Sequence, residues 1–275
     1  MASLQQIQSR RKAVKNVGQI TKAMEVVAAT KMRKSQDAAL RSRPYAQKVF
    51  ELLDRMLEFA PVTSDLAKPN GAEGTLVVIM TSDRGLIGAF NTQVLREAEK
   101  FSDATIVTVG RKATAYAGKR GMTIAKSFEG FGEFALPSET DELNNFLVEG
   151  YLEKKWGKVV MIYTHFQSTL KQVVKVENLL PLTLPTTHYT LSTSDYIFEP
   201  NPEDAINALM PHLLRMKIYD FILEANASEH SARMVAMKNA SDNATELTED
   251  LTLIYNKARQ ANITREIIEI TSAQI

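Results

Sequence analysis

The sequence predicts an α/β protein in which long N- and C-terminal helices pair as an antiparallel two-helix coiled coil, beside an α/β domain with a mostly parallel sheet. Two long stretches at opposite ends of the chain contain almost no helix-breaking residues. Between them, short apolar runs alternate with helical stretches. This order predicts an N-terminal coiled-coil helix at residues 1–61, an α/β domain at 75–200 and a C-terminal coiled-coil helix at 202–275.

The C-terminal segment, residues 202–274, is typical of one nearly unbroken helix. No glycine follows Gly157, and Pro211 is the only proline after Pro202. Such a helix would be roughly 100 Å long, whereas a compact protein of this length is only about 50 Å across. We therefore expect it to extend as a shaft. Its predicted coiled-coil seam consists of Met237, Ala240, Ala244, Leu247, Leu251, Ile254, Ala258 and Ala261.

The N-terminal segment, residues 3–60, shows the same helical pattern, with Gly18 as its only glycine and Pro44 as its only proline. The apolar residues that step by three and four along it are Val17, Ile20, Met24 and Val27. Because the two seams lie at opposite ends of the chain, an antiparallel pair is expected. Small residues in the C-terminal seam would let the two helices approach closely. Pro44 is expected to kink or end the first helix.

The middle of the chain has the pattern of alternating strands and helices. Strands are predicted at residues 75–81, 105–109, 122–127, 158–164, 171–177 and 196–198. Helices are predicted at residues 91–100, 111–119 and 138–155, the last with Ser138 as its N-cap. The alternating polarity of residues 171–177 is typical of an edge or antiparallel strand. The remaining order predicts a Rossmann-like domain whose mostly parallel sheet is covered by helices on both faces.

Positive charge is concentrated near the N-terminus. Residues 1–50 contain eleven Lys and Arg residues against Glu25 and Asp37, a net charge of +9 with histidine neutral. Such a block indicates an acidic protein surface or a polyanion as its partner. We favour a protein partner because apolar residues such as Met24 and Met32 are interleaved with the charges. Binding of duplex DNA through residues 10–48 is the alternative.

The sequence offers no convincing catalytic, cofactor or metal site. The turn at residues 85–90 follows a predicted strand but lacks the glycine spacing of a dinucleotide-binding loop. Ser82, Asp83 and Arg84 have suitable side chains for catalysis, yet no histidine lies nearby in the sequence to act as an oriented base. The four histidines show no metal-ligand spacing, and there is no cysteine. A nucleotide-binding enzyme with a Rossmann-like core is a weaker alternative.

No run of 18 apolar residues is present, so no segment is predicted to span a membrane. The basic N-terminus also lacks the apolar core of a signal peptide.

Residues 20–32 (ITKAMEVVAATKM) and residues 82–91 (SDRGLIGAFN) are two of four blocks of sequence that resemble one protein family, the gamma subunit of F-type ATP synthases. The first block resembles that family's N-terminal helix, and the second resembles its first strand–turn motif. Glu229 with residues 232–240 and 242–244 matches its C-terminal signature, which residues 255–266 continue. The resemblance covers essentially the whole chain.

This resemblance implies a non-catalytic rotor in the central stalk. Its coiled coil would turn inside a hexamer of alternating alpha and beta subunits, and its α/β domain would be a foot on the membrane ring of c subunits that also holds epsilon. Proton flow would drive rotation, and nucleotide chemistry would belong to beta. No cofactor and no nucleic acid would be bound by this chain. The family and the start at Met1 imply the cytoplasmic side of a bacterial inner membrane.

The resemblance also implies contact residues. Arg259, Gln260, Thr264 and Glu266 fall where the shaft engages a loop of beta, and Lys22 and Met24 fall where it passes an acidic region of beta. Tyr196, Phe198 and Glu199 fall in the foot near the c ring and epsilon. Departures from the family pattern are Ile87, Phe90 and the ending at residues 271–273. The cysteine-bearing regulatory insertion of chloroplast relatives is absent, which implies no thiol control.

Overall fold

The computed structural model describes residues 4–57, 63–131, 137–182, 199 and 201–272. They form two compact units: one comprises Met1–Ala29 with Arg233–Ile275, and the other comprises Thr30–Ala232. Two long helices, α1 (Leu4–Leu57) and α5 (Pro202–Ser272), each contribute residues to both units. The predicted long terminal helices are therefore confirmed within the described residues.

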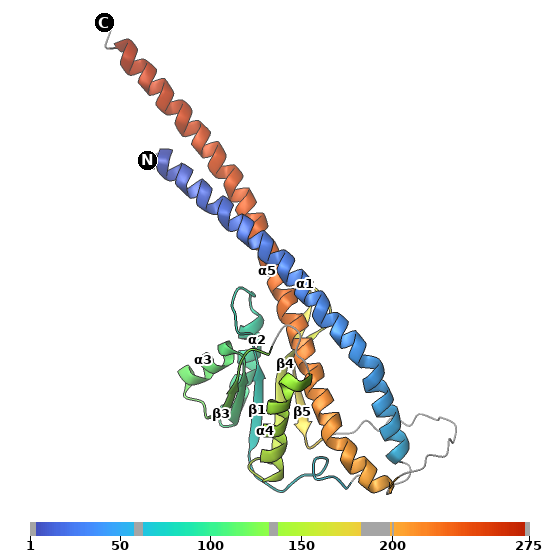
Figure 1. Cartoon of the computed structure of the whole chain (residues 1–275). Helices are drawn as coiled ribbons and strands as arrows, with labels where there is room; N and C mark the ends of the chain where they lie inside the picture. The colour runs from blue at the N-terminus through green and yellow to red at the C-terminus, as the bar shows by residue number, and fades with distance from the viewer. Residues whose placement is uncertain (1–3, 58–62, 132–136, 183–198, 200, 273–275) are drawn as a thin grey trace. The chain divides into compact units, whose positions relative to one another are not determined.

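In the first unit, α1 and α5 run side by side in opposite directions (Figure 1). The guanidinium of Arg11 lies 5.1 Å from the ring centroid of Tyr255. Seven residues further along α1, a Cβ atom added to Gly18 would lie 3.2 Å from the Cβ of Ala244. Because the numbering rises along one helix and falls along the other, the predicted antiparallel pairing is confirmed.

The seam between these helices differs in part from the predicted one. On α5, Met237, Ala244 and Leu251 are buried as expected, but Leu247 and Ile254 are 40% and 50% exposed. The positions between the buried residues are taken by side chains that the prediction omitted. They are Ser241, which is buried, and Thr248 and Tyr255, which are half-buried. Ala240 and Ala258 are half-buried, and Ala261 is exposed.

On α1 the predicted seam is displaced by one residue. Val17, Ile20 and Val27 are 52%, 59% and 52% exposed, and Met24 is half-buried. The buried positions are instead Thr21 and Ala28. The hydroxyl of Thr21 donates to the carbonyls of Val17 and Gly18 in its own helix, at 3.1 and 3.0 Å. A hydroxyl satisfied in this way can be buried without a partner across the seam, and small side chains let the backbones approach.

Pro44 does not end the first helix, contrary to one of the two expectations, because it lies inside α1, which continues to Leu57. A proline removes one backbone hydrogen bond from a helix. Buried residues on both sides of it, Met32 before and Val49 and Leu53 after, hold the helix on its path. Packing therefore overrides the local preference.

The second unit contains a five-stranded sheet in the order β3-β2-β1-β4-β5. Its strands are β1 (Thr75–Met80), β2 (Thr105–Val109), β3 (Ile124–Phe128), β4 (Lys158–Phe166) and β5 (Gln172–Leu180). The first four are parallel, and β5 pairs antiparallel with β4 at the edge of the sheet. The predicted α/β class, the mostly parallel sheet and the antiparallel edge strand are confirmed. The predicted strand at 196–198 lies outside the described residues.

Helices cover both faces of this sheet (Figure 1). The helices α2 (Phe90–Ala98) and α3 (Arg111–Arg120) pack on the face that carries Val77 and Ile79. The opposite face packs against α4 (Asp141–Leu152), α5 and the end of α1. Successive side chains of β1 alternate between these two cores, because strand side chains point to opposite faces. A strand buried on both faces has the continuous apolar run that the sequence shows.

The start of α4 differs from the prediction. The α-helix begins at Asp141, and Ser138 lies in a preceding 3-10 turn, Pro137–Thr140, so Ser138 is not the N-cap. Asp141 and Glu142 in the first turn supply the negative charge that favours a helix N-terminus.

Gly150 is a position where α4 tolerates no side chain. An added Cβ would lie 2.0 Å from the ring of Trp156, which packs directly on the helix backbone. We expect Gly150→Ala to destabilise the fold by about 1–3 kcal/mol through overpacking. Gly118→Ala in α3 is the matched control, since nothing lies within 4 Å of its added Cβ. That change should stabilise by about 0.5–1 kcal/mol. Urea unfolding of both variants measures the difference, and equal effects would contradict this reading.

Candidate functional site

The predicted contact residues near the end of α5 are all exposed. They are Arg259, Gln260, Thr264 and Glu266. For Thr264 and Glu266 the reason is a difference in helix length: α1 begins seven residues before Arg11, whereas α5 continues seventeen residues past Tyr255. The last turns of α5 therefore extend past the described part of α1. Their side chains are placed where another protein could reach them.

Lys22 and Met24, the other two predicted contacts with beta, lie on α1. Lys22 is exposed and forms an ion pair with Glu25 at 3.0 Å, one turn along the helix. Exposed pairs of this kind contribute at most about 1 kcal/mol, so a partner carboxylate could compete for the ammonium group. Met24 is half-buried beside it.

Large apolar side chains remain exposed on both helices of the first unit. On α1 they include Val17, Ile20, Val26 and Val27. On α5 they include Leu247, Leu253, Ile254, Ile263, Ile267, Ile268 and Ile270. Extended apolar surface of this kind marks a protein interaction site. Sequence reasoning assigned five of these residues to the seam, because hydropathy alone does not distinguish a face that meets the partner helix from one that meets another chain.

The predicted foot residues are described only in part. Glu199 is exposed. Tyr196 and Phe198 lie outside the described residues.

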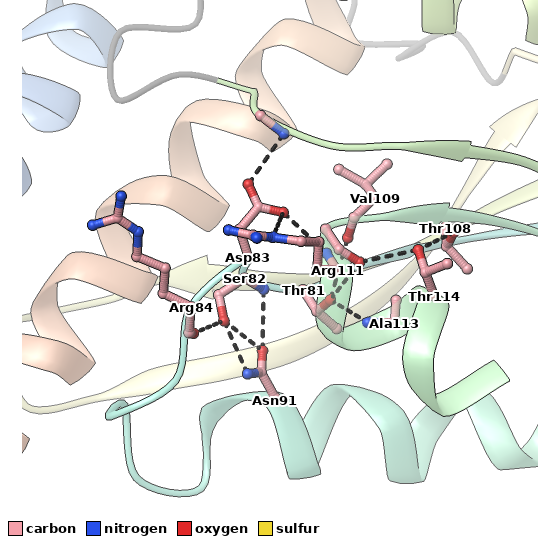
Figure 2. Close-up of polar contacts among 12 residues, drawn as sticks. Thr81, Ser82, Asp83, Arg84, Asn91, Thr108, Val109, Arg111, Ala113 and Thr114 are labelled. Carbon is pink, nitrogen blue, oxygen red and sulfur yellow. Dashed lines mark hydrogen bonds and ion pairs between the residues drawn. The ribbon is translucent and has the colours of Figure 1, made fainter. Parts of the chain in front are cut away.

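The loop after β1 contains the sequence candidates Ser82, Asp83 and Arg84, and the structure joins them to neighbouring loops (Figure 2). Ser82 is 1% exposed, and its hydroxyl donates to the carbonyl of Arg84 at 2.6 Å. The side-chain amide of Asn91 donates to the same hydroxyl at 2.9 Å, and its carbonyl oxygen accepts from the Ser82 amide at 3.1 Å. Ser82 is thus a structural residue that fixes the turn into α2.

Asp83 connects the loop after β1 to the loops after β2 and β3, which lie at the carboxyl ends of the same parallel strands. One carboxylate oxygen accepts from the backbone amide of Arg111, the first residue of α3, at 3.0 Å. The other accepts from the amide of Gly130 after β3, at 3.1 Å. A carboxylate at a helix N-terminus is favoured by the helix dipole. Sequence reasoning missed both of these partners, because they are distant from Asp83 in the chain.

We expect Asp83→Ala to destabilise the fold by about 1–3 kcal/mol, because two backbone amides would lose their charged acceptor. Chemical unfolding measures the change. Glu73 is an exposed acid at another place in the same unit, and Glu73→Ala serves as the control for loss of one negative charge. If both variants unfold alike, the bridging role of Asp83 is wrong.

A small cavity lies next to this loop, lined by residues that include Thr81, Asp83, Gly130, Asn226 and Glu229. Its volume is about 40 Å³, enough for a few water molecules. Sites for small-molecule ligands measure roughly 300–1,000 Å³. The cavity therefore does not fit a nucleotide, which disfavours the Rossmann-like enzyme alternative at this position.

Among the described residues, no group of three or more His, Cys, Asp or Glu side chains is arranged to hold a metal ion. The described residues also include no helix with the length and hydropathy that a membrane span requires.

Comparison with known proteins identifies the family. A family model described as ATP synthase matches residues 3–274. The ATP synthase gamma chain of Moorella thermoacetica is 40% identical over 278 residues, covering 99% of this chain and 98% of that protein. The ATP synthase gamma chain of Chlorobium phaeobacteroides is 38% identical over 287 residues, covering 99% and 97%.

Two solved structures of ATP synthases contain chains that are similar to this one. A chain from the central stalk and c ring of the Tetrahymena thermophila mitochondrial ATP synthase is similar with a TM-score of 0.61 and 26% identity, covering 81% of this chain and 99% of that one. A chain of the Euglena gracilis mitochondrial ATP synthase has a TM-score of 0.70 at 21% identity, covering 98% and 93%, and supports the fold alone. From the family match and the gamma-chain relatives together, this chain belongs to the ATP synthase gamma chain family.

Proposed function

We propose that this chain is the non-catalytic central-stalk rotor subunit of an F-type ATP synthase. It couples proton flow through a membrane ring of c subunits to ATP synthesis and hydrolysis in an alpha/beta hexamer, and it regulates the ATPase activity. The observation that carries the proposal is the 40% identity to a bacterial gamma chain over 99% of this sequence. The exposed apolar residues of the paired terminal helices support it, because such a surface suits burial inside other subunits.

The proposal assigns the two terminal segments, residues 1–61 and 202–275, to the shaft and residues 75–200 to the foot. Tyr196, Phe198 and Glu199 belong to the foot, where c-ring and epsilon subunits would bind. The antiparallel pairing of α1 and α5 supports this assignment, since two paired helices bend and twist less readily than a single helix. The ATP-hydrolysing sites belong to beta.

Charge and exposure support the shaft contacts that the family resemblance implies. Arg259, Gln260, Thr264 and Glu266 lie on the exposed end of α5, where their side chains could form hydrogen bonds with a loop of beta. Lys22 and Met24 lie within the basic N-terminal block, whose net charge of +9 suits an acidic region of beta.

The chain would be a peripheral component of a membrane-associated complex. The two gamma-chain relatives named above are bacterial, and we propose that the complex lies on the cytoplasmic side of the bacterial inner membrane. Attachment would run through the c ring.

Co-expression with cognate alpha and beta subunits tests the proposal. A complex of three alpha, three beta and one copy of this chain, identified by native mass spectrometry and active in ATP hydrolysis, is the expected result. Failure to associate would contradict it. Salt-dependent retention of the chain on duplex DNA through residues 10–48 would then support the nucleic-acid alternative, and saturable nucleotide binding would support the enzyme alternative.

A further inference from the structure

The β4–β5 hairpin extends further along the sheet than β1 does. β1 pairs with β4 only as far as Ile79 opposite Ile162, whereas β4 and β5 remain paired to Phe166 opposite Gln172. We call residues 164–173 the hairpin arm. A two-stranded hairpin is at best marginally stable by itself. The arm therefore depends on contacts outside the sheet, and α5 supplies them.

Two buried serines of α5 bind the backbone of the arm. The hydroxyl of Ser228 donates to the carbonyl of Thr164 at 3.0 Å. One turn further along, the hydroxyl of Ser231 donates to the carbonyl of Thr169 at 2.6 Å. Both serines are fully buried. The small serine side chains also let the strand backbone lie close to the helix.

Two side chains of the arm reach back toward α5. Nδ1 of His165 lies 2.6 Å from the carboxylate of Glu224, and both side chains are mostly buried. Nε2 of Gln172 donates to the Ser231 hydroxyl at 3.4 Å and to the Thr169 carbonyl at 2.8 Å. Because Gln172 binds both the arm and the helix, it ties the tip of the hairpin to Ser231.

The other end of the same hairpin meets α5 mainly through apolar packing, with one long hydrogen bond from the Lys217 ammonium to the Asn178 carbonyl at 3.5 Å. Leu179 and Leu180 at the end of β5 share one core with Met210 and Leu214 of α5. Apolar burial has no directional preference. This packing therefore opposes separation of α5 from the sheet more strongly than it opposes rotation of α5 against the sheet. Hydrogen bonds require defined distances and angles. The polar zone at the arm therefore opposes sliding and rotation of α5 against the sheet.

We propose that Ser228, Ser231 and Glu224 fix α5 to the hairpin arm through their side-chain polar contacts. These contacts prevent rotation of the helix relative to the α/β domain when torque is applied. The three residues act as positioning residues for torque transfer. This inference rests on the proposed function, because only a rotor carries torque between foot and shaft. The arm contacts themselves do not depend on that function.

The test combines two measurements on the double variant Ser228→Ala/Ser231→Ala. The first is amide hydrogen exchange of the full chain. Exchange of residues 164–173 should accelerate about tenfold, because the arm opens without its two donors, while exchange of β1 should not change. The second is ATP-driven proton pumping per ATP hydrolysed by the assembled complex, which should fall at least about twofold. Glu224→Gln should show a smaller effect of the same kind.

Thr245→Val is the matched control. Thr245 is a hydroxyl residue of the same helix, and its Oγ1 donates to the Ser241 carbonyl within α5. Its loss should change neither the exchange of the arm nor the pumping ratio. The ratio separates positioning from stability, because a variant that only folds poorly lowers the amount of complex and leaves the ratio per complex unchanged.

Unchanged exchange of the arm in the double variant would overturn the claim that these serines hold it. Faster exchange with an unchanged pumping ratio would overturn the role in torque transfer. Failure of the unmodified chain to assemble or to support pumping would instead contradict the proposed function, and the exchange measurement would still decide whether α5 holds the arm.

Discussion

Gly110→Ala is expected to destabilise the α/β domain by about 3–5 kcal/mol. Gly110 has a φ of 92°, and an added Cβ would lie 2.1 Å from the backbone carbonyl oxygen of Thr81. The backbone cannot easily shift there. The Gly110 amide donates to the Phe128 carbonyl and the Thr81 amide donates to the Val109 carbonyl, both at 2.8 Å. These bonds join the ends of β1, β2 and β3.

The matched control for this prediction is Gly121→Ala at the end of α3. Gly121 also has a positive φ, 67°, but nothing lies within 4 Å of its added Cβ. The Gly121→Ala variant should therefore be destabilised only by the cost of a left-handed backbone conformation, about 1–2 kcal/mol. Denaturant unfolding of the two variants separates strain from the steric clash. Losses of equal size would show that the close approach to Thr81 has no energetic consequence.

Removal of residues 259–275, or the double substitution Arg259→Ala/Gln260→Ala, is expected to produce the largest functional loss. The two side chains are exposed on α5. Loss of the proposed charge-assisted contacts to beta should lower the ATPase turnover of the assembled complex about tenfold or more for the double variant. The free energy of unfolding of the isolated chain should change by less than about 0.5 kcal/mol, as for most surface substitutions.

Lys238→Ala controls for the loss of one positive charge on the same helix, since Lys238 is also exposed. Its complex should keep normal turnover. Normal ATP-driven turnover and proton pumping in the Arg259→Ala/Gln260→Ala complex would show that these residues are not the contact through which the shaft acts.

The strands and the long helices were predictable because each leaves a strong local signal. A strand buried on both faces, such as β1, must be apolar along its whole length. A helix of 71 residues requires a long stretch with few glycines and prolines. The end of β4 was less predictable. Residues 165 and 166 are His and Phe, and their strand conformation depends on pairing with β5 and on the contact with Glu224.

The seam between the terminal helices was harder to predict because apolar residues occupy more than one face. The strongest apolar stripe on α1 contains Val17, Ile20 and Val27, which are exposed. The side that meets α5 contains Gly18 and Thr21. Because these two residues have low hydropathy, an apolar pattern does not predict that they lie in the seam. Which stripe meets the partner helix depends on backbone approach distance, a property of both helices together. Periodicity within one segment does not contain that information.

The residues that fix α5 to the hairpin arm carried no sequence signal for the same reason. Ser228 and Ser231 on a helix are ordinary surface residues by composition. Each donates to a carbonyl of the hairpin arm more than 60 residues earlier in the chain. The family resemblance, by contrast, depends on contiguous blocks of residues, which a single sequence displays completely.

The most direct test of the central claim is rotation of this chain inside the assembled hexamer. The chain contains no cysteine, so Lys119→Cys, at an exposed position in α3, creates a single labelling site. With the hexamer immobilised and a probe on this cysteine, ATP should drive continuous rotation in one direction, and the rotation should stop when ATP is removed. A complex that hydrolyses ATP at full rate while the labelled chain stays fixed relative to the hexamer would contradict the rotor function.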